Sequence, residues 1–180
     1  LTEENRTLQL RVDQLETQMR SGNLVFHGVP ESSYAEAASV ASKDWGGQRP
    51  SSRQDTVKAV IECCRKKLDL EISERDISAG FRVPGLKNAP RPIVVTFASR
   101  LVRDRIYELR RLLRKQDTAQ RVYINEHLTK KNADIFSKGR KLFKEKRIAS
   151  IWTWNGAVFV RRAESDRPTR VLSLEEVENF

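Results

Sequence analysis

A group of arginines at helical spacing is the strongest sign of a binding site in this sequence. Placed on a helical wheel at about 100° per residue, five arginines and one tyrosine fall within an arc of roughly 100°. These residues are Arg100, Arg103, Tyr107, Arg110, Arg111 and Arg114. Asp104 and Glu108 fall outside the arc, whereas a solvated face normally mixes both signs in i,i+4 ion pairs. The pattern therefore favours phosphate binding over a merely solvated surface.

The positive charge of the chain is concentrated in the same region. The 180 residues carry a formal net charge of +10. Residues 99–170 hold 20 Lys and Arg against eight Asp and Glu, whereas residues 1–98 are nearly neutral. Charge gathered in one segment indicates a polyanionic partner, because evenly spread charge would serve solubility alone.

Catalysis and metal binding have little support in the sequence. The two histidines, His27 and His127, have no nucleophile–base motif beside them, and no glycine-rich phosphate loop is present. Cys63 and Cys64 are adjacent, so they cannot form a disulfide framework or a four-ligand zinc site. Helical spacing assigns Cys64 to the core and leaves Cys63 partly exposed. We therefore expect that the protein is not an enzyme and has no catalytic residue, metal or cofactor. The absence of a disulfide framework also indicates a reducing compartment.

The chain also lacks the marks of membrane insertion. No run of about 18 apolar residues occurs, and the first ten residues are too polar for a signal peptide. The sequence does not begin with Met, which indicates a fragment of a longer protein.

Residues 1–20 contain a heptad repeat. Leu1, Leu8 and Leu15 occupy d positions, and Asn5, Val12 and Met19 occupy a positions. A polar residue such as Asn5 at a is typical of a position that fixes register. Arg11 and Glu16 flank the apolar pair in the pattern R-h-x-x-h-E, which resembles that of short trimeric coiled coils. The segment predicts the end of a coiled coil, with a trimer favoured over a dimer; the alternative is an amphipathic helix folded back on the globular part.

The middle of the chain predicts an α+β domain. We expect strands at residues 23–29, 76–83, 93–97 and 121–125 and helices at residues 54–70 and 101–115, with a long loop over residues 31–52. This β-α-β-β-α-β order is typical of ferredoxin-like and RNA-recognition (RRM-like) folds, with two helices on one face of a four-stranded antiparallel sheet. Val25 stands where a base-stacking aromatic is expected, so Phe26 and Phe97 are assigned to the core and the sheet is not the main binding surface.

The last third of the chain predicts a small α+β module. A helix over residues 129–147, with Thr129 as N-cap, carries an apolar face that includes Phe143. A β-hairpin over residues 148–162 turns at Asn155-Gly156, the preferred type I′ dipeptide. Its pairing places Trp152, Trp154, Phe159 and Arg161 on one face. That face either forms a base-stacking platform or covers the helix. A third strand within 167–172 and an acidic helix capped by Ser173 and Glu176 complete the module.

Two stretches carry a resemblance to known families. NLVFHGVPES after a coiled coil resembles the start of the RRM-like domain in first-reading-frame proteins of LINE-type (non-LTR) retrotransposons. VYINEHLTKKN and IWTWNGAVFVRR resemble the C-terminal module of the baculovirus FP protein family, which is similar to modules of invertebrate retroelements. The resemblance spans nearly the whole chain.

The resemblance implies three parts: a coiled coil at 1–20, an RRM-like domain at 21–126 and a C-terminal domain at 127–180. It implies a homotrimer that clasps single-stranded RNA, or single-stranded DNA, and acts as a nucleic-acid chaperone. The expected setting is a cytoplasmic retrotransposon ribonucleoprotein particle, with the nucleus as a second location and no membrane. The alternative is a structural or interaction protein of the FP type, whose basic patch binds acidic protein partners.

The expected site residues come from the residue patterns and from the family resemblance together. Matching the family's second helix and linker adds Lys115, Arg121, Lys130 and Lys131, while no adjacent Arg pair stands where the mammalian LINE pattern has one. The expected nucleic-acid-binding set is Arg100, Arg103, Tyr107, Arg110, Arg111, Arg114, Lys115, Arg121, Lys130, Lys131, Arg140, Lys141, Lys144, Trp152, Trp154, Arg161 and Arg162. The expected oligomerisation set is Leu1, Asn5, Leu8, Arg11, Val12, Leu15, Glu16 and Met19.

Overall fold

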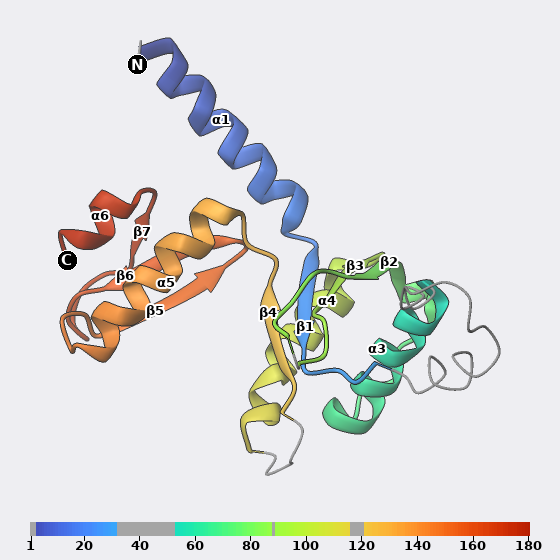
Figure 1. Cartoon of the computed structure of the whole chain (residues 1–180). Helices are drawn as coiled ribbons and strands as arrows, with labels where there is room; N and C mark the ends of the chain where they lie inside the picture. Colours follow the sequence, from blue (N-terminus) through green and yellow to red (C-terminus); the bar gives the residue numbers. More distant parts are fainter. Residues whose placement is uncertain (1–2, 32–52, 88, 116–120) are drawn as a thin grey trace. The chain divides into compact units, whose positions relative to one another are not determined.

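A computed structural model describes residues 3–31, 53–87, 89–115 and 121–180. Within these ranges the chain forms five α-helices and two antiparallel sheets, so the expected α+β class is confirmed (Figure 1). The chain divides into two compact units, Gly22–Asn125 and Leu1–Ser21 with Glu126–Phe180. The heptad position Leu1 and most of the expected loop at 31–52 lie outside the described residues.

The first unit contains a four-stranded sheet and two helices. Its elements are β1 (Asn23–His27), α3 (Arg53–Leu68), β2 (Ile77–Arg82), β3 (Ile93–Phe97), α4 (Arg100–Leu109) and β4 (Tyr123–Glu126), whose last residue belongs to the second unit. The strands lie in the order β2-β3-β1-β4, and β3 pairs antiparallel with both β1 and β2. All four strands and both helices are expected from the sequence. The bounds of β3 agree with the expectation and most other ends differ by one or two residues, but α4 ends at Leu109, six residues before the expected end at Lys115.

Strand alternation separates the core of this unit from its surface. Leu24 and Phe26 of β1 are fully buried and form a core with Val60 and Ile106 of the two helices. Phe97 of β3 is also buried there, so the assignment of Phe26 and Phe97 to the core is confirmed. On the opposite face, Val25 is partly exposed and Phe81 is about half exposed, whereas Val94, which pairs with both, is buried.

Both cysteines are buried inside this core, which corrects the expectation of a partly exposed Cys63. The buried face of α3 is wider than the predicted stripe, because Thr56 and Cys63 also turn inward beside Val60 and Cys64. Burial raises the pKa of Cys63 to about 11 and that of Cys64 to about 12. Both thiols are therefore protonated at neutral pH and unreactive.

The second unit contains a helical arm and a small α+β module. Its elements are α1 (Glu3–Arg20), α5 (Lys130–Lys144), β5 (Ser150–Trp154), β6 (Ala157–Arg161), β7 (Thr169–Val171) and α6 (Leu174–Glu178). The three strands lie in the order β5-β6-β7, and α5 lies along one side of β5 and β6 (Figure 1). The side chain of Thr129 caps α5 by accepting a hydrogen bond from Asn132 N, and Ser173 caps α6 in the same way.

The β5–β6 hairpin has the predicted register. Trp152 faces Phe159, Trp154 faces Ala157 and the turn residues are Asn155 and Gly156. Both turn residues have positive φ, 51° and 78°, as a type I′ turn requires. The Asn-Gly dipeptide thus fixes which side chains share a face of the ribbon.

The arm α1 buries none of its residues. Its heptad side chains are open to solvent, with 60% of Val12 and 61% of Leu15 exposed. A helix of 18 residues gains little stability without tertiary packing. The apolar stripe of α1 is therefore available for a partner.

Polar residues on another side of α1 fasten the arm to the C-terminal module. Asp13 forms an ion pair with Lys131, and Arg20 donates a hydrogen bond to Leu128 O at 3.1 Å. Arg20 also lies 3.3 Å from Nε2 of His127, whose pKa is lowered by burial and by this guanidinium. Asp13 and Arg20 both occupy b positions of the heptad, outside the a/d stripe, so these contacts leave the stripe open.

Candidate nucleic-acid interface

Arg103 does not project from an exposed face of α4, which corrects the sequence expectation. Only 2% of the residue is exposed. Its Nη1 atom donates to Asp104 Oδ1 at 2.8 Å, and Asp104 also lies 3.7 Å from Arg100 Nε. The expectation that no acid lies among these arginines is therefore also wrong, because a helical wheel does not account for how far an arginine can reach toward a neighbouring carboxylate.

Tyr107 is covered by arginines instead of being open for stacking. The guanidinium carbon of Arg110 lies 3.4 Å from the ring centroid, and that of Arg103 lies 5.0 Å from it. Arg110 also donates a hydrogen bond to Tyr107 O. These contacts are cation–π interactions that hold the end of α4 together.

The predicted helix 101–115 changes its geometry at Arg110. From there to Lys115 the backbone forms a 3₁₀ helix, with about three residues per turn. The tighter winding rotates the last side chains away from the predicted arc. Arg111 and Arg114 are exposed, and neither forms an ion pair with any residue that the structure describes. They are the members of the arginine group best placed to meet an anion, together with Arg121, which is exposed just before β4.

The end of α5 carries a second group of cations. Arg140, Lys141, Lys144, Lys146 and Arg147 are all exposed, and Glu145 is the one acid among residues 140–147. Within the described ranges, none of these five side chains forms an ion pair. Cations near a helix C-terminus are stabilised by the helix dipole, but five of them repel one another unless an anion is near. We define these five residues as the α5 basic cluster.

A groove of about 550 Å³ adjoins this cluster. It is lined by Phe143, Lys144, Lys146, Ile148, Ala149 and Arg162. Phe143 is 49% exposed, which corrects its assignment to the apolar face of the helix. The sequence signal for this site is the run KGRKLFKEKR at 138–147, in which an aromatic residue stands between cations.

Two lysines at the start of α5 have acidic partners. Lys130 pairs with Asp134 at 3.2 Å and remains highly exposed. Lys131 pairs with Asp13 of α1, and about a third of its side chain is accessible. Lys131 therefore has a structural contact that the sequence did not suggest, whereas Lys130 can still reach an anion in solvent.

The tryptophans of the hairpin lie on the face of the sheet opposite α5. The core between sheet and helices is built from other residues, among them Val158, Val160 and Val171. Trp152 and Phe159 stack at a centroid distance of 6.0 Å, and the guanidinium carbon of Arg161 lies 5.7 Å from the Trp152 centroid. Arg162 points to a different partner, with its guanidinium carbon 5.4 Å from the Phe180 centroid. The reading in which the tryptophans cover the helix is thus wrong.

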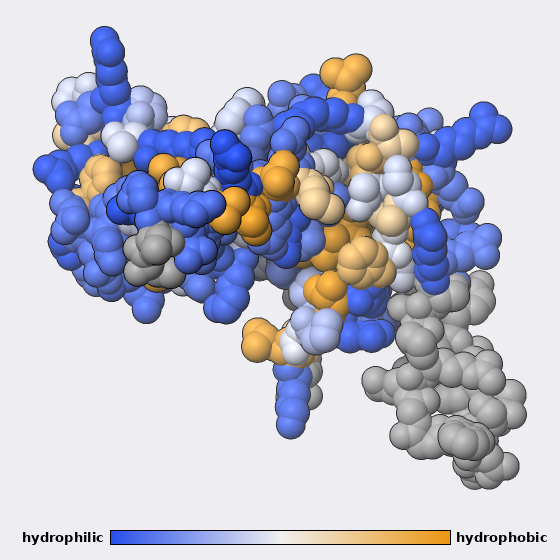
Figure 2. Space-filling view, turned by 90° about the horizontal axis from the view of Figure 1, so that it is seen from above, coloured by the Kyte–Doolittle hydropathy of each residue, from blue (hydrophilic) through white to orange (hydrophobic). Residues whose placement is uncertain are grey.

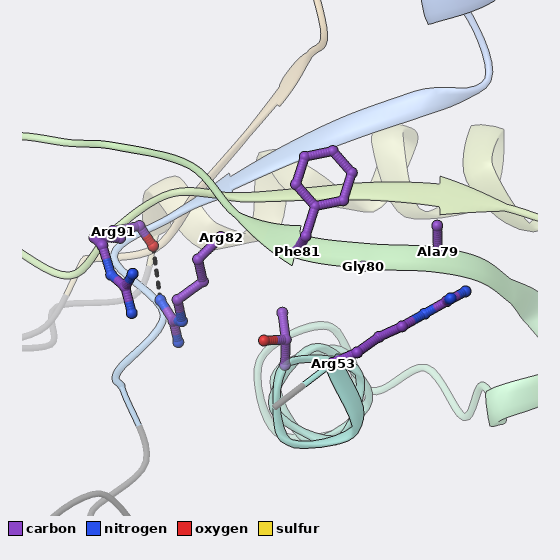
Figure 3. Close-up of a pocket in the computed structure, with 7 residues that line it drawn as sticks. Arg53, Ala79, Gly80, Phe81, Arg82 and Arg91 are labelled. Atoms are coloured by element: carbon purple, nitrogen blue, oxygen red, sulfur yellow. Dashed lines mark hydrogen bonds between the residues drawn. The ribbon is translucent and has the colours of Figure 1, made fainter. Parts of the chain in front are cut away.

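A pocket of about 340 Å³ lies beside the edge strand β2 of the first unit. Figure 3 shows Arg82 and Arg91 at one end of it, Arg53 on the side of α3, and Phe81 directed away from Arg53. Sequence reasoning did not identify this group of three arginines, since they come from separate elements.

These arginines already have partners, so the pocket is held by structural contacts. Arg82 donates to the carbonyl oxygens of Pro30 at 2.6 Å and Arg91 at 2.7 Å. Arg91 binds the Glu31 carboxylate through two nitrogens, and this pairing lowers the pKa of Glu31 to about 2. Arg53 donates to Ser78 O at 2.5 Å. Arg53 and Arg82 thus donate to backbone carbonyl oxygens near the strand ends, and Glu31 balances part of the charge of the three arginines. We therefore assign no ligand to this pocket.

Two further features concern metal binding and membrane insertion in the part of the chain that the structure describes. It contains no cluster of His, Cys, Asp and Glu able to hold a metal ion, and none of its helices is long and apolar enough to cross a membrane. Hydrophilic residues cover most of the face in Figure 2, where hydrophobic residues form small separate patches.

Compared with known proteins, the chain matches no family model and no curated protein sequence.

The burial of Arg103 leads to a testable expectation about stability. Replacing Arg103 by Ala removes a buried aliphatic stem and leaves a cavity, so we expect the free energy of unfolding to fall by about 2 kcal/mol. Arg105→Ala is the matched control, because the Arg105 side chain is 62% exposed and pairs only at the surface, at 3.8 Å, with Glu108. It should change stability by less than about 0.5 kcal/mol. Urea unfolding followed by circular dichroism measures both; equal effects would contradict the structural role of Arg103.

Proposed function

We propose that this protein binds single-stranded nucleic acid, RNA in particular, as a coiled-coil trimer with nucleic-acid chaperone activity. The observation that carries the proposal is the α5 basic cluster, whose five exposed cations have no ion-pair partner among the described residues. Neutralising phosphates with Lys and Arg releases counterions and supplies most of the affinity of sequence-independent binding. Phosphate contacts carry no sequence information, which suits a chaperone better than a sequence-specific reader.

The proposal assigns an RRM-like topology to the first unit. Support comes from the β-α-β-β-α-β order of its described elements and from the strand order β2-β3-β1-β4. Phe81 and Tyr123, about half exposed on the outer strands, offer aromatic surface on this sheet, whereas Val25 of the central strand β1 does not. Phosphate contacts from Arg111 and Arg114 beyond α4 therefore fit this unit better than stacking on its central strands.

The proposal also assigns oligomerisation to α1. The exposed a and d residues of the arm form one apolar stripe, and the contacts to the C-terminal module come from other heptad positions. An unpartnered apolar stripe on a helix is explained by burial against copies of the same helix. Three chains would then present three basic clusters to one RNA strand, as the resemblance to LINE-type first-reading-frame proteins implies.

The alternative occupant of the basic cluster is an acidic protein, as in a structural protein of the FP type. Both occupants are anionic, so net charge does not separate them. The spacing and flexibility of phosphates along a single strand predict a linear dependence of log affinity on log salt, with a slope near −0.7 per neutralised phosphate.

A salt titration tests the proposed function. We expect replacement of Arg140, Lys141 and Lys144 by Gln to flatten the dependence of log affinity on log salt by about two units. The loss should be similar for RNAs of different sequence. Fluorescence anisotropy of labelled single-stranded RNA over a series of KCl concentrations measures both quantities.

A control triple variant matches the change in charge. Lys58, Arg65 and Lys66 are exposed on α3, outside the basic segment, and their replacement by Gln lowers the net charge by the same amount. This variant should keep nearly the wild-type slope. Equal slopes for both triple variants would show that the cluster contributes only through the net charge of the protein. A wild-type protein that binds an acidic peptide but no RNA would support the FP-type alternative.

A further inference from the structure

The sheet of the C-terminal module has two unlike faces. Val158 and Val160 of β6 and Val171 of β7 are buried against α5 and α6. Ile151 of β5 lies on the same side, so close to α5 that a Cβ atom on Gly139 would come within 2.2 Å of its Cδ1 atom. This face is the core of the module and has no room for a ligand.

The opposite face is built from aromatic and basic side chains. Trp152 and Trp154 alternate with the core residues along β5, and the pairing places Phe159 beside Trp152 and Arg170 beside Phe159. Arg161 reaches over the Trp152 ring from the end of β6. We define Trp152, Trp154, Phe159, Arg161 and Arg170 as the tryptophan face.

None of these residues belongs to the hydrophobic core of the module. Trp154 is 61% exposed, although burying an aromatic ring of this size would stabilise the fold considerably. Trp152 and Phe159 are nearly parallel, with 16° between their ring planes. The two rings are partly exposed and form an aromatic contact between β5 and β6 on the side away from the core.

The charges on this face are all positive. Arg161 and Arg170 flank the rings, and the alternation of the three strands places no carboxylate among them. Arg161 is partly exposed and Arg170 is exposed, so both guanidinium groups can be reached from solvent. Protein-docking surfaces are equally apolar, but a flat aromatic surface bordered only by guanidinium groups is complementary to nucleotides, which combine a π-face with a phosphate.

We infer that the tryptophan face is a second nucleic-acid subsite, where unpaired bases stack on Trp152 and Trp154 while Arg161 and Arg170 contact the adjoining phosphates. The inference rests on the proposed function and assigns it a further site, separate from the basic cluster on α5. Stacking on aromatic side chains accepts every base, because each base has a π-face. The subsite therefore adds affinity for single strands over duplexes without adding sequence preference.

Tryptophan fluorescence tests this inference on the full chain without altering the face. Trp45, the one tryptophan of the sequence besides Trp152 and Trp154, is replaced by Phe so that the emission comes from Trp152 and Trp154. We expect oligouridylate to quench this emission, since stacked bases quench indole. An abasic oligomer of the same length and charge should bind through phosphates and leave the emission unchanged.

Substitution separates stacking from charge. Trp152→Leu with Trp154→Leu should weaken oligouridylate binding about tenfold or more and leave the slope against log salt unchanged, because no cation is lost. Trp154→Phe should retain most of the affinity, since a ring remains. Leu101→Ser, at an 83% exposed apolar position of α4, is the control and should bind like the wild type.

The outcomes distinguish this inference from the proposed function. Wild-type protein that fails to bind oligouridylate at all removes the proposed function. Wild-type binding with unquenched emission, or a double Leu variant as tight as the wild type, overturns the subsite alone. Emission that responds to an acidic peptide and not to oligouridylate would make the face a protein-docking surface and likewise overturn the inference.

Discussion

Replacing Val12 and Leu15 of α1 by Ser is expected to convert the proposed trimer into a folded monomer and to weaken the proposed RNA binding about a hundredfold or more. Both residues are about 60% exposed in the single chain and lie outside its hydrophobic core clusters, so their loss removes little packing within it. In the proposed trimer they fill the a and d layers, where a hydroxyl would replace buried apolar surface. The affinity falls because one strand no longer meets three linked binding surfaces.

Light scattering and sedimentation, with and without RNA, measure this result. Leu10→Ser is the matched control, since Leu10 is an exposed apolar residue of the same helix at an f position, outside the stripe. It should leave the mass of the assembly unchanged. A wild-type protein that sediments as a monomer at tens of micromolar concentration would exclude the coiled coil for this chain.

The contacts between α1 and the C-terminal module link oligomerisation to the position of that module. Arg20 and Asp13 hold Leu128 and Lys131 directly, so assembly of three α1 helices would also bring three C-terminal modules together. The residues that make these contacts differ from those of the a/d stripe. Arg20→Ala should therefore loosen the attachment of the C-terminal module to α1 while leaving the mass of the proposed trimer unchanged, which separates assembly from the positioning of the basic clusters.

Local sequence signals predicted the elements whose geometry depends on near neighbours. The Asn155-Gly156 turn fixed the register of the hairpin, and with it the residues of the tryptophan face. Thr129 and Ser173 were predicted as caps because their side chains need only reach three residues along the chain. Such signals are short in range and carry most of their information in one or two residue types.

The expectations that failed depend on contacts that a helical wheel does not include. Arg103 is buried because its long stem packs inward while Asp104 holds its guanidinium. The wheel assigns Phe143 to the same apolar face as Leu142, yet Leu142 is buried and Phe143 is half exposed. Lys131 is paired with Asp13, more than a hundred residues away, which no local pattern can reveal.

The largest loss of stability is expected from Gly28→Ala at the end of β1. Gly28 has a φ of 78°, a conformation that costs a residue with a Cβ atom about 1–2 kcal/mol. A Cβ atom there would also lie 2.1 Å from the carbonyl oxygen of Arg121, just before β4. A backbone oxygen cannot rotate away as a side chain can, so β1 and the segment entering β4 would have to separate.

We therefore expect Gly28→Ala to lower the free energy of unfolding by about 3 kcal/mol or more, at the upper end of single substitutions. Urea unfolding should show a lower midpoint with an unchanged m-value. Gly22→Ala is the matched control, since a Cβ atom at Gly22 meets nothing within 4 Å and no positive φ is required there; its effect should stay within about 0.5 kcal/mol. Equal midpoints for the two variants would contradict the close approach of Gly28 to Arg121. Because Arg121 is itself an expected phosphate contact, the Gly28 variant should also bind RNA more weakly at temperatures where it is still folded.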